Sequence, residues 1–192
     1  GIAYRIGRAV AQHLNAKSIV IGFDARETSP AFAAAASQGA RDAGADVINI
    51  GMAGTEEMYW AVTEFDACAG IEVTASHNPI NYNGIKIVKS HSRPLGDASD
   101  FQVIKALAGS QDWLSVSETG KELDLSDEAR KAYVDRVLRF VDVKALRPLK
   151  IVVNSGNGAA GPTFDAIAER LLELGAPLEF NCVHHVRDAT FP

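Results

Sequence analysis

The sequence is poor in cysteine, with two residues, Cys68 and Cys182, far apart in the chain. Both occur in apolar, strand-like segments, and the low cysteine content gives no sign of the disulfide framework of small secreted domains. We therefore predict two buried free thiols, as is common in cytosolic proteins, rather than a disulfide.

The sequence also lacks any run of about 18 apolar residues, the length that a membrane-spanning helix requires. Its first residues lack the basic segment and apolar run of a secretory signal peptide. We accordingly expect no membrane partner and a cytoplasmic location.

Clusters of Lys and Arg are absent as well. The 19 basic and 24 acidic residues are mixed along the chain and give a net charge of −5. Nucleic-acid-binding surfaces concentrate positive charge, so we expect no nucleic-acid partner. Small anions remain possible ligands, because backbone N–H groups and one or two cations suffice to bind them.

What the sequence does have is an alternation of strand and helix patterns. Apolar residues recur every four positions from Ile2 to Leu14, which predicts an amphipathic helix. Ser29 followed by Pro30 indicates an N-cap and a first helical residue. The predicted strands are 18–24, 46–51, 67–74, 84–88 (hairpin-like), 150–154 and 178–184, and further helices are predicted from 55, over 98–108, from 126 and over 162–174. This alternation is typical of layered α/β domains.

The pattern changes near residue 122, where we place a domain boundary between residues 1–121 and 122–192. The second unit has few elements for an independent α/β domain, and the first predicted helix has no capping residue before it. We expect both ends to be cuts in a longer protein, with a short natural chain as the alternative.

The most informative stretch is Thr-Ala-Ser-His-Asn-Pro at 74–79, followed by Tyr-Asn-Gly-Ile-Lys at 82–86. A buried strand leads into a tight loop that carries Ser76, His77 and Asn78, with Lys86 close behind. The serine is a candidate phosphate carrier, the histidine a proton donor or acceptor, and the lysine a cation for phosphate. From spacing alone, a polar hairpin turn remains the alternative.

Three other features have simpler interpretations. Arg26, just after the first predicted strand, either approaches a sugar phosphate or forms a structural ion pair within the domain, and we favour the ion pair. The Gly-rich turn at 155–161 lacks the ending of a nucleotide P-loop, and we favour packing against the neighbouring domain. His184 and His185 are adjacent in a predicted strand, where they would point to opposite faces and not share a metal ion.

The serine loop at 74–79 resembles that of the α-D-phosphohexomutase superfamily, and its continuation at 82–86 resembles the phosphomannomutase/phosphoglucomutase branch. The resemblance covers most of the chain and includes the segments 22–30, 51–60 and 154–161. It implies a layered αβα domain with a mixed sheet, followed by part of a second, similar α/β domain.

The resemblance also implies roles. Ser76 would carry the phosphate that passes to a hexose phosphate and gives a 1,6-bisphosphate, so that a hexose 1-phosphate becomes a 6-phosphate. His77 and Lys86 match positions implicated in proton transfer or sugar binding, and Asn78 and Asn83 would shape the loop. Mg²⁺ would be bound partly through the Ser76 phosphate, and glucose or mannose 1,6-bisphosphate would be the activator.

The departures from the family pattern also matter. The Asp-Gly-Asp-x-Asp-Arg metal loop, the sugar-selecting loop and the C-terminal phosphate-binding loop do not occur in these residues. We expect the remaining metal ligands beyond Pro192, the remaining domains of a parent chain as partners, and negligible mutase activity for this chain alone.

Three other functions compete with this one. A serine hydrolase is disfavoured because the glycines of a nucleophile elbow do not flank Ser76. A non-catalytic sugar-phosphate-binding module stays open. A phosphoglucosamine mutase also stays open, although the Tyr82-Asn83-Gly84 context argues against it.

Overall fold

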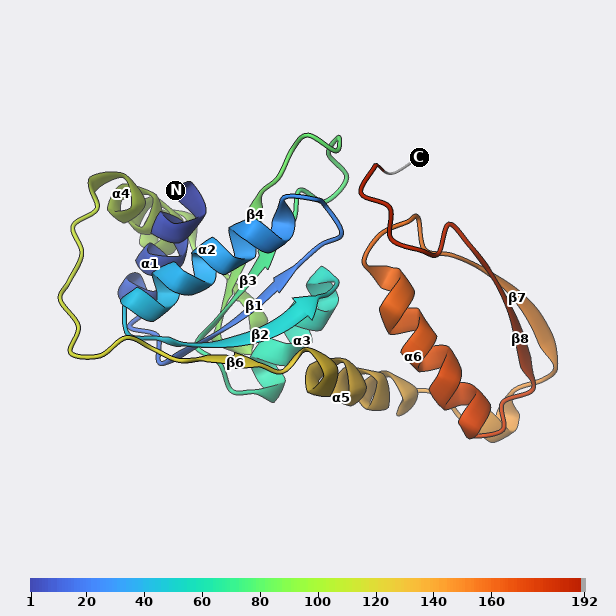
Figure 1. The fold of residues 1–192 in the computed structure, drawn as a ribbon. Helices are drawn as coiled ribbons and strands as arrows, with labels where there is room; N and C mark the ends of the chain where they lie inside the picture. Colours follow the sequence, from blue (N-terminus) through green and yellow to red (C-terminus); the bar gives the residue numbers. More distant parts are fainter. Residues whose placement is uncertain (191–192) are drawn as a thin grey trace.

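A six-stranded mixed sheet forms the centre of the first unit, with the strand order β5-β4-β3-β1-β2-β6 (Figure 1). The structure, a computed structural model, describes residues 1–190. The strands are β1 (Ser18–Phe23), β2 (Asp46–Met52), β3 (Ala69–Val73), β4 (Ile85–Lys89), β5 (Arg93–Pro94) and β6 (Glu122–Asp124). β1, β2, β3 and β6 run parallel, whereas β4 is antiparallel to β3 and to β5.

Helices cover both faces of this sheet (Figure 1). One face packs against α1 (Ile2–His13), α2 (Ser29–Asp42) and α4 (Gln102–Ser110), with Ile19, Ile21 and Ile71 in the shared core. The other face packs against α3 (Thr55–Glu64) and α5 (Ser126–Leu138), with Val20 and Ile50 in that core. Neighbouring residues of a strand thus enter opposite cores, because side chains alternate across a sheet. The predicted layered αβα domain with a mixed sheet is confirmed.

Short helical turns complete this unit and its connection. They are η1 (Ser90–Ser92), η2 (Asp97–Phe101) and η3 (Val143–Ala145). Within residues 1–190, no helix is both long and apolar enough to span a bilayer.

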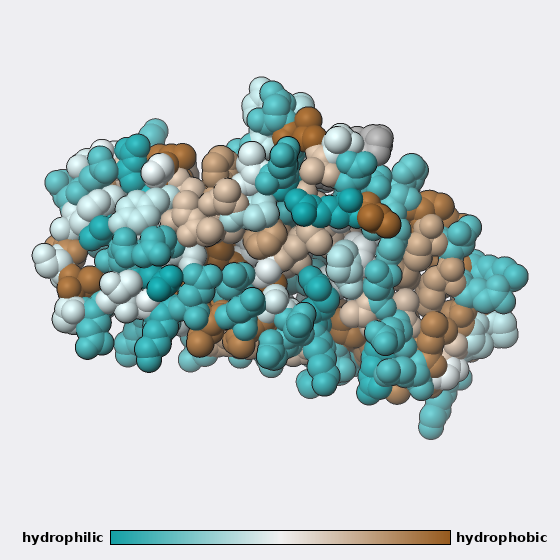
Figure 2. Space-filling view, viewed as in Figure 1, coloured by the Kyte–Doolittle hydropathy of each residue, from teal (hydrophilic) through white to brown (hydrophobic). Residues whose placement is uncertain are grey.

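The second unit consists of two parallel strands and their crossover helix. β7 (Leu149–Asn154) pairs with β8 (Leu178–Val183), and α6 (Ala160–Glu173) connects them. Figure 2 shows apolar surface among polar groups over this unit, where Val152 is 68% exposed. The predicted second domain extends to residue 192, and its last two positions lie outside the described residues.

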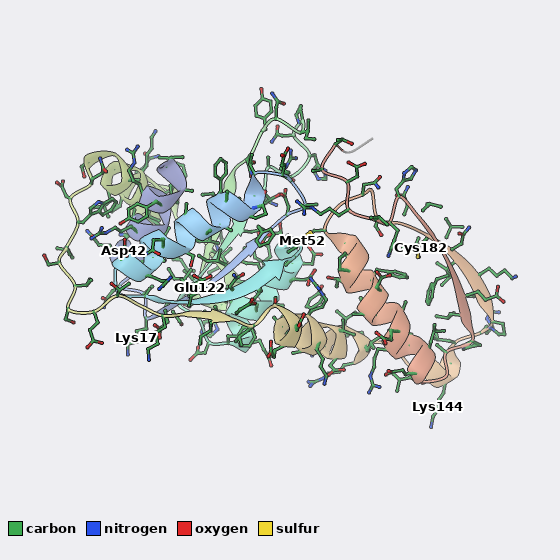
Figure 3. The ribbon with its side chains drawn as sticks, in the orientation of Figure 1. Lys17, Asp42, Met52, Glu122, Lys144 and Cys182 are labelled. Carbon is green, nitrogen blue, oxygen red and sulfur yellow. The ribbon has the colours of Figure 1, made fainter. Side chains whose placement is uncertain are left out.

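Hydrogen bonds join the second unit to the first. The Thr163 hydroxyl on α6 donates to Glu57 Oε1 on α3 at 2.8 Å. Arg187 Nε donates to the carbonyl oxygen of Ala25 at 2.9 Å. On α5, Arg130 donates to the carbonyl of Met52 at 2.7 Å, and Met52 lies at the end of β2 facing α6 (Figure 3).

Several details differ from the sequence expectations. β6, immediately after the predicted boundary, pairs with β2 and so belongs to the first sheet. Thr28, not Ser29, is the N-cap of α2, and the Ser29 hydroxyl donates to Asp24 Oδ1 at 2.6 Å. Both thiols are free, but Cys182 is exposed and Cys68 half-buried, which corrects the expectation that both are buried.

Candidate active site

The serine loop follows β3, at the carboxyl ends of the parallel strands, where open α/β sheets place their ligands. Ser76, His77 and Asn78 are all exposed on this loop. Ser76 adopts a φ of 55°, a left-handed conformation that costs a non-glycine residue about 1–2 kcal/mol. Such a conformation at an exposed serine requires support from the surrounding structure.

Part of this support is local. The Ser76 backbone N–H donates to the Thr74 hydroxyl at 2.9 Å. The Asn78 side-chain amide donates to the carbonyl of Ala75 at 2.9 Å, and the Asn78 backbone N–H donates to the same carbonyl at 3.0 Å. Asn78 therefore closes the turn around the serine.

The larger support comes from Arg26, which is 3% exposed. Its guanidinium group donates to four carbonyl oxygens of the serine loop, those of Ser76 (3.1 Å), Asn78 (2.7 Å), Pro79 (2.8 Å) and Tyr82 (3.1 Å). Its Nε donates to Asp24 Oδ2 at 3.2 Å. The arginine thus makes the expected ion pair and, in addition, fixes the loop backbone from a position fifty residues away in sequence.

Asn83 joins the far end of the loop to the start of α2. Its side-chain amide donates to the hydroxyl groups of Thr28 (2.8 Å) and Ser29 (2.9 Å), and its Oδ1 accepts from the Gly84 N–H at 2.8 Å. Because Ser29 in turn donates to Asp24, the two loops form one hydrogen-bonded unit.

Ser76 lies at a pocket of about 200 Å³ between the two units. Its walls include Asp24, Glu72, Thr74, Thr55 and, from the second unit, the Gly158–Ala159 turn. Lys86 on β4 donates to the Thr55 hydroxyl at 3.4 Å, and so its ammonium group lies beside the pocket wall. The structure brings Ser76 and Lys86 to one pocket region, with His77 on the adjacent exposed loop.

Two acids near this pocket are buried. Glu57 is 5% exposed, and burial raises its pKa although it accepts hydrogen bonds from Thr163 and from the Gly54 N–H. Glu72 is 1% exposed, and burial, followed by the negative charges of Asp24 and Glu57, raises its pKa well above the ordinary value of 4.5. Sequence reasoning did not single out Glu72, although a lone carboxylate within an apolar strand is a usable signal.

The backbone N–H groups of the Gly-rich turn before α6 are hydrogen-bonded within the protein. The N–H groups of Gly156, Asn157 and Gly158 donate to acceptors within the turn and to the carbonyl of His184. These donors are therefore committed to the turn itself rather than to an anion.

The two histidines lie after β8, not within it as expected from the sequence. His185 Nδ1 is 2.9 Å from the Ser155 hydroxyl, and its Nε2 is 2.7 Å from Asp165 Oδ1. The pair of contacts ties the turn to α6. In the part of the chain that the structure describes, no three His, Cys, Asp or Glu side chains gather as a metal site.

Comparisons with known proteins agree with this geometry. The family model "Phosphoglucomutase/phosphomannomutase, alpha/beta/alpha domain I" matches residues 1–112. The phosphomannomutase of Salmonella montevideo is 48% identical over 191 residues, and that of Vibrio cholerae is 43% identical over 198 residues. Each alignment covers 100% of this chain and 42% of the relative, so the chain spans less than half the length of these proteins.

A solved structure agrees as well. A phosphoglucomutase/phosphomannomutase family protein from Burkholderia thailandensis superposes with a TM-score of 0.78 at 29% identity, covering 100% of this chain and 41% of that one. The fold, the family model and the serine loop lead to the same conclusion: the chain belongs to the phosphoglucomutase/phosphomannomutase family.

Proposed function

We propose that this chain supplies the phosphoserine loop of a phosphohexomutase that interconverts hexose 1-phosphates and hexose 6-phosphates. The observation that carries the proposal is Ser76 itself, a serine exposed in a left-handed conformation at a pocket, with its loop held by Arg26. Relatives named phosphomannomutase support a hexose phosphate as substrate.

In the proposed reaction, Ser76 Oγ carries a phosphoryl group. A hydroxyl oxygen of the bound sugar phosphate attacks the phosphorus, the bond from phosphorus to Ser76 Oγ breaks, and a 1,6-bisphosphate forms. The proton of the attacking hydroxyl leaves, and the serine oxygen regains a proton when it departs. The other phosphate of the bisphosphate then returns to Ser76, so the phosphate count of the enzyme is unchanged.

The loop residues have distinct parts in this proposal. Lys86 places an ammonium group at the pocket wall, where it offsets phosphoryl charge. His77, on the exposed loop, is the proposed carrier of the hydroxyl proton. Arg26, Asn78 and Asn83 position the loop, because their contacts go to loop backbone and to neighbouring hydroxyl groups. An oriented loop lowers the entropic cost of bringing phosphate and hydroxyl together.

Mg²⁺ and a hexose 1,6-bisphosphate are the proposed cofactor and activator. When bound, the ion would neutralise phosphoryl charge. A phosphoryl oxygen on Ser76 fits one ligand position. Residues 1–190 gather no set of three metal-ligating side chains, so the other ligands would come from elsewhere in the protein.

We further propose that the two units are a first domain and part of a second, in a cytoplasmic enzyme whose other domains complete the site. Residues of both units line the Ser76 pocket, which supports this proposal. On this proposal the 192-residue chain alone has negligible mutase activity.

A coupled assay of hexose 1-phosphate conversion tests the proposal. The full-length protein should convert the substrate and its Ser76→Ala variant should not. Ser117→Ala, at an exposed serine in the connection between α4 and β6, should match wild type. Turnover by the Ser76→Ala variant, or by the isolated chain, would contradict the corresponding part of the proposal.

A further inference from the structure

Arg187 lies in the segment that follows β8, and its side chain reaches the first unit. Its Nε donates to the carbonyl oxygen of Ala25 at 2.9 Å, and its Nη2 donates to the carbonyl oxygen of Arg26 at 3.4 Å. Two neighbouring carbonyls therefore accept hydrogen bonds from one guanidinium group. The planar fork of an arginine suits such a pair of acceptors, whereas the ammonium group of a lysine is a point charge without this geometry.

The two residues that accept from Arg187 belong to the surroundings of Ser76. Ala25 lines the Ser76 pocket, as does the preceding Asp24. Arg26 is the residue whose own guanidinium group donates to four carbonyl oxygens of the serine loop. Because Arg187 bonds to the backbone of residues 25 and 26, it constrains the position from which the Arg26 side chain reaches the loop.

The segment that carries Arg187 is also bonded to the Gly-rich turn, through Asn157. Three hydrogen bonds join the backbone and the side-chain amide of Asn157 to the backbone of His184, Val186 and Asp188, at 2.6, 2.8 and 3.0 Å. Gly158, the next residue of the turn, lines the Ser76 pocket. One hydrogen-bonded piece of the second unit therefore forms a pocket wall at Gly158 and contacts the first unit at Arg187.

Arg187 is exposed, and its positive charge suggests a competing role, which is direct contact with a substrate phosphate. Its Nε and Nη2 are directed at backbone carbonyls, however, which favours a role in positioning. The two roles have different requirements. Contact with phosphate requires a cation, whereas the two carbonyls require two donors in a fixed geometry.

We propose that Arg187 is a positioning residue: by bonding the segment after β8 to the backbone of residues 25 and 26, it fixes the Gly158 wall of the pocket relative to the serine loop. This inference rests on the proposed function, because the alignment matters for phosphoryl transfer at Ser76. Misplacing a reacting group by about 1 Å costs about 100-fold in rate. Loss of the Arg187 contacts should therefore lower kcat rather than raise KM.

Hydrogen exchange of the full-length protein, followed by mass spectrometry, tests the structural part of this inference without any phosphate. Peptides that cover residues 74–83 should exchange roughly 2-fold to 10-fold faster in Arg187→Ala than in wild type, the factor that the loss of one hydrogen bond supplies. Arg170→Ala is the matched control, because this exposed arginine of the same unit pairs with Glu173 and Asp135. It should leave the exchange of these peptides unchanged. Unchanged exchange in Arg187→Ala would overturn the inference and leave the proposed function standing.

The coupled assay of hexose 1-phosphate conversion tests the catalytic part. Arg187→Ala should lose roughly 10-fold to 100-fold in kcat with KM nearly unchanged. Arg187→Lys keeps the charge without the forked donors and should lose nearly as much. A lysine variant with the kcat of wild type, or an alanine variant in which KM alone rises, would indicate contact with phosphate and overturn the positioning role. A wild-type protein that converts no hexose phosphate would overturn the proposed function and this inference with it.

Discussion

The guanidinium group of Arg26 donates a hydrogen bond of 3.1 Å to the carbonyl oxygen of Ser76, the residue whose φ of 55° is left-handed. The same side chain contacts three further carbonyls of the loop and the carboxylate of Asp24. A planar group with five donors suits this task, and the single ammonium of a lysine would not reproduce it. The conformation of the serine loop therefore depends on a residue of another loop.

Replacement of Arg26 should be costly. Arg26→Ala leaves Asp24 without its ionic partner and four loop carbonyls without donors, and we expect the free energy of unfolding to fall by about 3–5 kcal/mol. Urea unfolding measures this directly. Arg170→Ala, which removes an exposed ion pair with Glu173, is the control and should cost less than about 1 kcal/mol. Equal losses in the two variants would contradict the assigned importance of Arg26.

The left-handed conformation of Ser76 leads to a second prediction. Glycine adopts positive φ without steric cost, so Ser76→Gly should raise the free energy of unfolding by about 1 kcal/mol while Ser76→Ala should leave it nearly unchanged. Thermal unfolding of both variants provides the comparison. If Ser76→Gly were no more stable than Ser76→Ala, the strain at this position would be absent.

Glu72 makes stability depend on pH in a defined direction. Its pKa in the folded protein is raised above the ordinary 4.5, so the folded state binds the proton more tightly than the unfolded state. Its contribution to stability is therefore present at low pH and is lost as pH rises from about 4.5 through the raised pKa.

Glu72→Met cannot titrate and should abolish this loss. At pH 8 we expect the variant to be more stable than wild type by about 1–3 kcal/mol, the usual cost of an unsatisfied buried polar group. Unfolding free energies of both proteins between pH 4 and pH 9 test this. A variant that is less stable than wild type throughout would show that Glu72 has a stabilising partner after all.

The sequence predicted the regular elements well, because their signals are local. Apolar residues at helical spacing and short apolar runs mark α1 and β1, and the layered αβα fold follows from their alternation. β6 was missed because its three residues are exposed and pair only with β2 at the sheet edge. The two histidines were placed within the strand predicted over 178–184, whereas β8 ends at Val183 and they follow it.

The site itself was predictable only in part. The serine loop has a local motif, and Ser76, His77, Asn78 and Lys86 were found from it, although their roles stay predictions. The contacts of Arg26 with the loop were not foreseen, because they join loops that follow different strands. Glu72 was overlooked although it is a lone carboxylate in an apolar strand; the space that Gly22 of the neighbouring strand leaves for it becomes visible only in the fold.

The central claim is that Ser76 carries phosphate, and intact mass tests it most directly. The full-length protein and its Ser76→Ala variant are weighed before and after incubation with glucose 1,6-bisphosphate and Mg²⁺. The account predicts that the wild-type protein gains the mass of a single phosphoryl group and that the variant gains none. The same mass gain in both proteins, or no phosphate on either before or after treatment, would contradict it.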